Sequence, residues 1–144
     1  MPKPGGLSAT DQAILAAADG MAAKARAAMK TQQLHQVLNH VWAVVADANR
    51  YFAGEAPWAS AKTDPQRMGT VLYVTAEVIR QIAILAQPFM PASGGKLLDL
   101  LAVPPGERDF SRLGGAHRIA AGGSLPPPTP VFPRYIDPEA SAPA

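Results

Sequence analysis

The sequence predicts an all-α fold, in which a bundle of about four helices is followed by an extended, proline-rich tail. Hydrophobic residues make up 48% of the 144 residues but aromatic residues only 6%. The core must therefore consist mainly of Ala, Leu, Val and Ile, a mixture that favours helices over a sheet. Apolar residues also recur at steps of three and four over long stretches, which is the spacing of an amphipathic helix.

The first helix is expected to follow a lead-in of residues 1–7. Ser8 is a good N-cap, and Asp11 three residues later completes a capping box. The predicted helix runs to about residue 29. Its apolar stripe consists of Ile14, Ala18, Met21, Ala25 and Met29.

Thr31 is expected to cap a second helix, and Gly54 to end it in the left-handed conformation that glycine adopts at low cost. Trp42 lies at the edge of the apolar stripe and is expected in the core. The predicted buried stripe consists of Leu34, Val37, Leu38, Val41, Val45, Ala48 and Phe52.

The third long helix has the strongest start signal, because Asp64 can cap it and Pro65 suits the first helical position. It is expected at the centre of the bundle and should end at Pro88. A short fourth helix should follow Pro91, so that residues 8–105 form the helical domain. The third helix's predicted stripe is Met68, Val71, Leu72, Thr75, Val78, Ile79, Ile82 and Leu85.

The composition changes after residue 105. Residues 125–136 contain five of the chain's 15 prolines, which excludes a helix there. Apolar side chains in the same stretch argue against a free linker. Residues 106–137 are therefore expected to form an extended, docked tail, and residues 138–144 a disordered end.

The stretch 48–62 contains the candidate functional residues. Trp58 directly follows Pro57 at the predicted end of the second helix, near Asn49, Arg50 and Lys62. A ring, an amide and cations suit an unpaired nucleotide, because the ring can stack, the amide can read a base edge and the cations can hold phosphate.

Each of these residues also has a purely structural interpretation. Trp58 could pack the connector against the bundle, and Asn49 could bond free carbonyls at a helix end. Arg50 could be a solvated cation favoured by the helix dipole. Lys62 and Arg67 could be ordinary surface charges, or the nearest phosphate contacts if RNA lies along this end.

The same stretch resembles the anticodon-binding domain of methionyl-tRNA synthetases, in which Asn49–Tyr51, Ala56–Trp58 and Lys62 match motifs at this spacing. The resemblance continues through residues 72–80, 87–91 and 132–134. Other class I synthetases with helical anticodon domains share a looser pattern, and the Phe-Pro-Arg tail favours methionine. The resemblance implies that Trp58 stacks on an anticodon base of methionine tRNA and that the tail folds back along the synthetase.

The resemblance also implies that parts of the synthetase are missing from this sequence. The family's catalytic domain carries a His-rich motif and a Lys-Met-Ser-Lys-Ser loop, and neither occurs here. We therefore expect no catalytic residue and no cofactor in this chain; ATP would belong to the full-length enzyme, and a catalytic domain would act in cis or in trans. The first helix of the family's helical domain is also expected to be absent, which should leave an exposed apolar face and cause marginal stability or self-association.

Composition excludes or weakens several other classes. The chain has no cysteine and three histidines, and His35 and His40 lie about 140° apart around a helix, so a metal site is not expected. No signal peptide and no apolar run of membrane-spanning length is recognised. The absence of cysteine is mildly favourable for the cytoplasm. The net charge of +2 does not by itself predict nucleic-acid binding.

A second function remains open on the residues alone. The Pro127–Pro130 stretch contains a PxxP match, which could dock on an SH3-like groove. The chain could thus be a helical scaffold or protein-docking module that uses its apolar stripe or its proline tail.

Overall fold

The computed structural model describes residues 1–133, so that predictions for residues 134–144, including Arg134 and the disordered end, lie outside the described residues. The all-α prediction is confirmed: residues 1–133 contain helices and no strand. The helices are α1 (Ala9–Lys30), α2 (Leu34–Glu55), α3 (Pro57–Ser60), α4 (Pro65–Ala86) and α5 (Pro91–Leu100). Three short 3₁₀ turns follow, η1 (Pro105–Glu107), η2 (Phe110–Arg112) and η3 (Gly115–His117).

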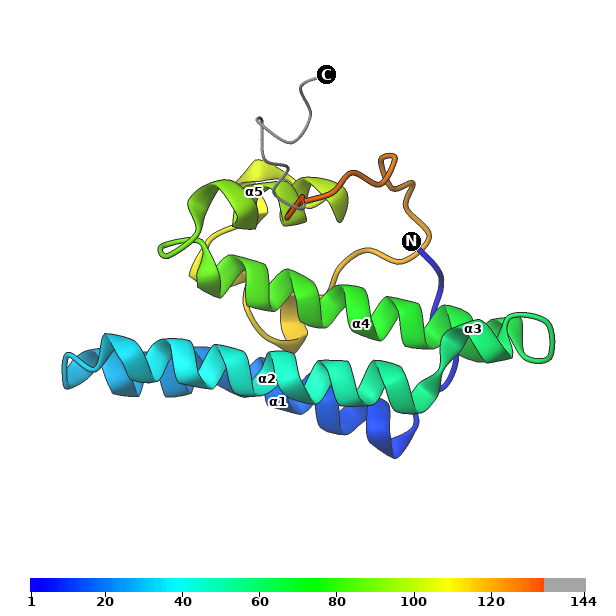
Figure 1. The fold of residues 1–144 in the computed structure, drawn as a ribbon, viewed down its shortest axis with the longest axis horizontal. Coiled ribbons are helices and arrows are strands. Elements are labelled where there is room, and N and C mark those ends of the chain that lie inside the picture. Colours follow the sequence, from blue (N-terminus) through cyan, green and yellow to red (C-terminus); the bar gives the residue numbers. More distant parts are fainter. Residues whose placement is uncertain (134–144) are drawn as a thin grey trace, which may run out of the picture.

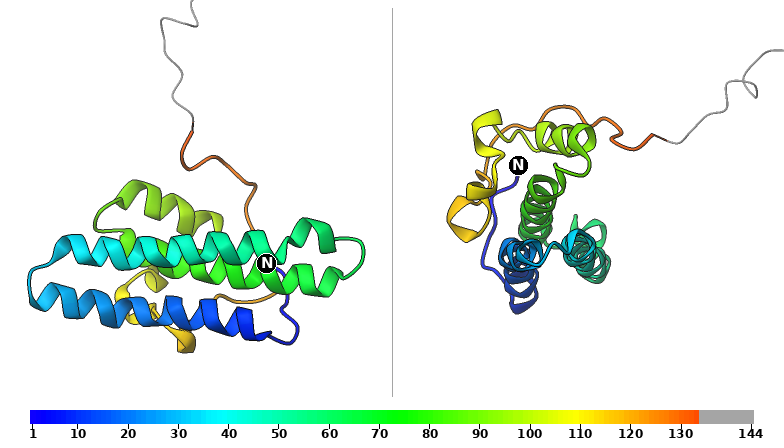
Figure 2. Two further views of the ribbon diagram at one scale, coloured as in Figure 1. Left: turned by 60° about the horizontal axis from the view of Figure 1, so that its bottom comes forward. Right: turned by 90° about the vertical axis from the view of Figure 1, so that its left-hand side faces the viewer.

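The long helices pack in sequence order. α1 and α2 run antiparallel side by side, and α4 packs against both of them (Figure 1). α5 lies on the other side of α4, so that α4 is the central helix, as predicted (Figure 2). The connections between these helices are short, which is why neighbouring helices are antiparallel.

The start of α1 has the predicted capping box. The Ser8 Oγ accepts a hydrogen bond from the Asp11 N–H at 3.2 Å, and the Asp11 carboxylate accepts one from the Ser8 N–H at 2.8 Å. Four of the five predicted stripe residues are buried, but Met29 is 50% exposed. The reason is that the C-terminal end of α1 projects beyond α4, as Figure 1 shows.

The bounds and the buried face of α2 differ from the prediction. Thr31 ends α1, since its N–H bonds the Ala28 carbonyl, and α2 begins after Gln33 without a side-chain cap. Gly54 stays helical, and Ala56 takes the left-handed conformation instead, with φ 39° and ψ 59°. The buried side chains are Val37, Val41 and Val44.

Trp42 is therefore not in the core, contrary to expectation: it is 49% exposed, and Leu34 is 54% exposed. α2 carries two adjacent apolar stripes, one through Val37, Val41 and Val44 and one through Leu38, Trp42 and Val45. Both satisfy helical spacing. The first stripe is buried against α1 and α4, and the second lies at the edge of the contact.

α4 begins as predicted. The Asp64 side chain accepts the Arg67 N–H at 2.9 Å, and Pro65 is the first helical residue. Among residues 1–133 only α4 is long and apolar enough to cross a membrane by length and composition, which corrects the expectation that no such run exists. Most of this helix is buried in the bundle, and it contains the buried charges Glu77 and Arg80, so we interpret it as the core helix.

The segment after α5 lies against the bundle, with 3₁₀ turns in place of the fully extended backbone expected from residue 106. Arg118 pairs with Asp19 of α1 at 2.7 Å, and the Ile119 N–H donates to Glu77 of α4 at 2.9 Å. The Gly122 N–H donates to the Met1 carbonyl at 2.9 Å. These bonds tie the segment to α1, to α4 and to the N-terminus.

Candidate nucleic-acid interface

The candidate site lies where α2 ends and α3 begins. α2 stops at Glu55, the left-handed Ala56 reverses the chain, and Pro57 begins α3. Pro57 is buried, and its ring fixes the backbone just before Trp58. Pro57 is one of the predicted RNA-binding residues, and a contact from its own ring stays a prediction; in the free chain its ring orients the next residue.

Trp58 presents an open aromatic surface. The residue is 64% exposed. The indole contacts the Phe52 ring edge-on, with ring centroids 5.8 Å apart and planes inclined by 61°. This geometry supports the ring from one side and leaves a face accessible to a flat ligand.

Asn49 lies on the same side of α2 as Phe52, because residues three apart are about 60° apart around a helix. It is exposed, and its side chain has no hydrogen-bond partner within residues 1–133. The helix continues to Glu55, so the interpretation of Asn49 as a helix-end amide is wrong. Its amide is therefore available beside the Phe52–Trp58 pair.

Arg50 lies on another side of α2, because it is about 160° from Phe52 around the helix. Its side chain is 73% exposed and forms an ion pair with Asp47. With Thr10 and Ile14 it lines a hollow between α1 and α2. The structure therefore does not bring Arg50 next to Trp58.

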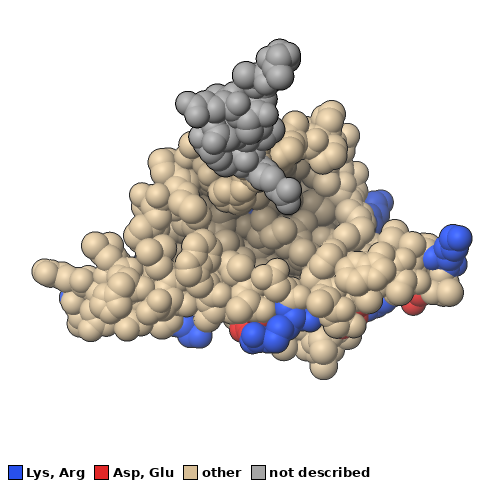
Figure 3. Space-filling view, in the orientation of Figure 1, with Lys and Arg blue, Asp and Glu red and all other residues tan. Residues whose placement is uncertain are grey.

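Lys62 is exposed in the turn between α3 and α4. Figure 3 shows that Lys and Arg side chains are sparse on the face drawn and gather along its lower edge and at the end where α3 lies. On this face the cationic side chains therefore form no broad patch, in keeping with the net charge of +2.

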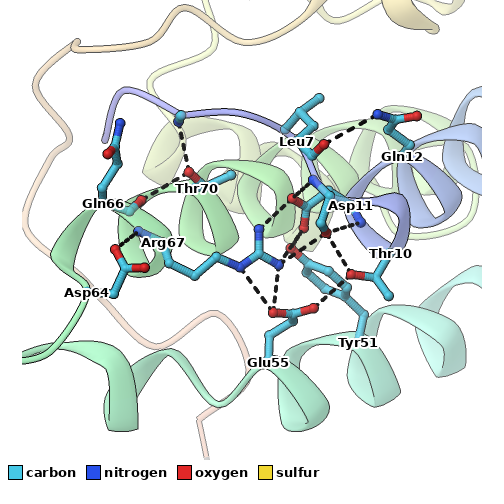
Figure 4. A network of polar contacts seen from close by, with 12 residues as sticks. Leu7, Thr10, Asp11, Gln12, Tyr51, Glu55, Asp64, Gln66, Arg67 and Thr70 are labelled. Atoms are coloured by element: carbon cyan, nitrogen blue, oxygen red, sulfur yellow. Dashed lines mark hydrogen bonds and ion pairs between the residues drawn. The ribbon is translucent and has the colours of Figure 1, made fainter.

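Arg67 takes part in a polar network that joins three helices (Figure 4). Its terminal nitrogens bind the Asp11 carboxylate of α1 at 2.6 and 2.9 Å. Its Nε donates to Glu55 of α2 at 3.2 Å, and one terminal nitrogen lies 2.6 Å from the same carboxylate. Each of the three guanidinium nitrogens thus has an acidic partner, which a free surface cation would not have.

Asp11 is the buried centre of this network, with no exposed surface. The Tyr51 hydroxyl donates to it at 2.6 Å. Burial alone would raise the pKa of Asp11, but hydrogen bonds from Arg67, Tyr51 and Ser8 outweigh it and lower the pKa from its ordinary 3.8 to about 2. Burial and the bond to Asp11 raise the pKa of Tyr51 well above its usual range. The hydrogen bonds to Asp11 and Glu55 likewise raise the pKa of Arg67.

Sequence reasoning identified Asp11 only as a cap and missed Glu55 and Phe52 as supports of the site. The four-residue spacing of Tyr51 and Glu55, which puts both on one face of α2, was a usable signal. Nothing local shows that Arg67, 56 residues after Asp11, would bind it. Residues 1–133 contain no group of three or more His, Cys, Asp or Glu side chains able to hold a metal ion.

The all-α bundle has the fold expected of the class that the sequence resembles, the helical anticodon-binding domains of aminoacyl-tRNA synthetases. The comparisons with known proteins specify the family. The family described as "Anticodon binding domain of methionyl tRNA ligase" matches residues 1–142. The chain belongs to this family.

Individual relatives agree. The chain is similar to the methionine–tRNA ligase of Rhizobium meliloti, with 58% identity over 140 residues, and to that of Brucella suis, with 56% identity over 137 residues. These alignments cover 97% and 95% of this chain but only 27% and 26% of the relatives. The chain thus spans about a quarter of the length of the curated relatives it matches.

Solved structures show the same fold. The free form of Mycobacterium tuberculosis methionyl-tRNA synthetase superposes with a TM-score of 0.89 at 44% identity, covering 95% of this chain and 28% of that one. The same enzyme bound to methionyl-adenylate gives a TM-score of 0.88 at 43% identity, covering 92% of this chain and 26% of that one.

Proposed function

We propose that this chain recognises the anticodon loop of methionine tRNA, as the C-terminal part of a methionyl-tRNA synthetase. A catalytic domain outside these 144 residues would use ATP to attach methionine. The observation that carries the proposal is Trp58, a residue that is 64% exposed although the backbone on both sides of it is fixed. Exposing a large ring in this way is costly for a purely structural residue and useful for base stacking.

Three residues take the main roles in the proposed complex. Trp58 stacks on an unpaired anticodon base, which is worth about 1–3 kcal/mol. Asn49 hydrogen-bonds a base edge beside it, and Lys62 meets phosphate. Arg50 is proposed to meet phosphate from the α1 side of α2, away from the stacked base.

The test is a titration of the purified chain with an anticodon stem-loop of methionine tRNA and with one of altered anticodon. We expect tighter binding of the unaltered loop, and a loss of roughly 5- to 150-fold in Trp58→Ala. Trp42→Ala is the matched control, because Trp42 is also exposed but lies at a distance along α2. Equal binding of both loops, or equal effects of the two substitutions, would contradict the proposal.

The division of labour within the synthetase has a separate test. The chain alone should show no methionine-dependent ATP–pyrophosphate exchange, because that chemistry is proposed to belong to the catalytic domain. Exchange activity in the purified chain that survives further purification would contradict this part of the proposal.

A second candidate function, protein docking or self-association, is favoured by the exposed apolar side chains of α2, Leu34 and Trp42. The PxxP stretch at residues 127–130 is also exposed. In the titration above, no RNA binding together with concentration-dependent association would favour this candidate. We propose the cytoplasm as the location, since tRNA charging for protein synthesis takes place there.

A further inference from the structure

The ion pair between Glu55 and Arg67 closes the base of the segment that carries Trp58. Glu55 is the last residue of α2, and Arg67 lies in the first turn of α4, 12 residues further on. All of α3 and Lys62 lie between the two. Figure 4 shows Arg67 reaching from α4 to the end of α2. The segment is therefore tied at both ends, which restricts its movement.

Arg67 is itself held in place by α1. Asp11, which is fully buried, binds two of its nitrogens in a fork at 2.6 and 2.9 Å. Asp11 in turn is fixed by the capping box with Ser8 and by the Tyr51 hydroxyl. The Arg67 side chain is only 23% exposed. If the Arg67 guanidinium moved to bind a phosphate, the buried Asp11 carboxylate would lose its cationic partner, which is strongly unfavourable.

We propose that Arg67 and Glu55 form a clamp that positions Trp58 for base stacking, so that Arg67 acts on RNA binding through Trp58 and not as a phosphate contact. This inference rests on the proposed function. Only Ala56 and Pro57 separate Glu55 from Trp58, and both have fixed conformations. A shift of Glu55 is thus passed to the indole, whose aromatic support is a single edge contact with Phe52.

The clamp and a simple charge model predict opposite signs for one substitution. Removing the Glu55 carboxylate raises the formal net charge from +2 to +3, and on charge alone this tightens RNA binding. It also removes one of the two carboxylates that bind Arg67 and leaves the Asp11 fork in place. The clamp instead predicts weaker binding, because the indole loses its fixed position. Glu55 is partly exposed, at 22%, so Glu55→Ala should still fold.

The experiment uses the full 144-residue chain with Trp42→Phe, so that Trp58 is the only tryptophan. Thermal melts confirm that each variant is folded. In Glu55→Ala, we expect time-resolved anisotropy to show a more mobile indole without RNA, and binding of the methionine anticodon stem-loop to weaken roughly fivefold, part of the loss for a whole stacked base. The ratio of affinities for the unaltered and the altered anticodon should also fall, whereas the salt dependence of RNA binding should stay unchanged. Glu107→Ala removes an exposed carboxylate elsewhere and should change none of these.

Arg67→Lys separates the two roles of the arginine. Lysine keeps the positive charge that a phosphate contact needs. It cannot form the two parallel hydrogen bonds by which the arginine binds a carboxylate. We expect Arg67→Lys to behave like Glu55→Ala. The clamp would be overturned if Glu55→Ala bound the stem-loop as tightly as the parent chain or more tightly, with no change in indole mobility. It would also be overturned if Arg67→Lys bound the stem-loop as tightly as the parent chain. If the parent chain binds no stem-loop, the proposed function fails, and the mobility of Trp58 in the free protein still decides whether the clamp exists.

Discussion

Ala56 has a positive φ of 39°, although Gly54 stands only two residues before it. Sequence reasoning placed the turn at Gly54 because glycine adopts this conformation most readily. The turn falls later because Pro57 cannot extend α2, since it has no N–H to bond the helix and its ring would clash with the preceding turn. The left-handed conformation costs an alanine about 1–2 kcal/mol. The residue that bears this strain, Ala56, is the one that directs the chain toward Trp58.

This placement predicts that Gly54→Ala stabilises the protein by about 0.5–1 kcal/mol, because Gly54 is in the last turn of a helix and a Cβ there meets nothing within 4 Å. Urea denaturation measures the change. Gly114→Ala is the control and should destabilise, since Gly114 has a φ of +94°. Destabilisation by Gly54→Ala would place the left-handed residue at Gly54 after all.

At the same scale, the sequence predicted the exposure of the main candidate residues better than it predicted their surroundings. Trp58, Asn49 and Lys62 are exposed at one end of the bundle, as a ligand-facing role requires. The sequence could not separate Trp58 from Trp42 by exposure, because both stand beside apolar neighbours and only the packing of α4 decides which stripe is covered. It also could not show that the Arg67 guanidinium is already occupied.

Among the elements, the starts of helices α1 and α4 could be predicted, because a helix start depends on residues that are neighbours in sequence. The capping box of α1 and the Asp64–Pro65 start of α4 both formed as expected. The contacts that join the helices are not local, and they include two polar networks that no periodicity reveals. One is centred on Asp11 and joins α1, α2 and α4; the other is centred on Glu77 and joins α4 to the segment after α5.

The Asp11 network predicts acid sensitivity. The pKa of Asp11 is lowered to about 2 in the folded chain, below its unfolded value near 4. Stability from this group is therefore fully present above about pH 5 and is lost as the pH falls toward 2, by roughly 2 kcal/mol in total. Urea denaturation at pH 7, 5 and 3 should show the loss, and Asp11→Asn should reduce it. Equal stability at pH 5 and pH 3 would contradict the network.

The Glu77 network predicts a large loss of stability from a single change. Glu77 is fully buried, binds Arg80 at 2.8 and 2.9 Å and accepts the Ile119 N–H. Glu77→Ala leaves Arg80 buried without its carboxylate partner and should cost about 3–5 kcal/mol. Glu107→Ala, at an exposed position, should cost under about 0.5 kcal/mol. A loss below about 1 kcal/mol for Glu77→Ala would show that the pair is dispensable.

For the molecule as a whole, the fold class followed from composition and helical spacing, whereas the exposure of apolar side chains on its surface did not. The chain spans about a quarter of its curated relatives, and α2 exposes Leu34 and Trp42. Apolar side chains that are exposed in this chain can be covered by another part of a longer protein or by a second copy.

We therefore predict concentration-dependent self-association of the isolated chain. Sedimentation velocity between micromolar and millimolar concentrations should show a rising average mass. Leu34→Gln with Trp42→Gln should reduce the association, because it removes exposed apolar surface, whereas Leu125→Gln, at another exposed leucine, should not. A strictly monomeric parent chain over this range would contradict the prediction.

Base fluorescence can show whether Trp58 stacks on one anticodon base. Stem-loops of methionine tRNA carrying 2-aminopurine at each anticodon position in turn would be titrated with the Trp42→Phe chain and with the same chain carrying Trp58→Ala. We predict that the fluorescence of one position changes strongly on binding, that the others change little, and that Trp58→Ala abolishes the change. The same change at that position without Trp58 would show that the indole does not stack there and would contradict the account.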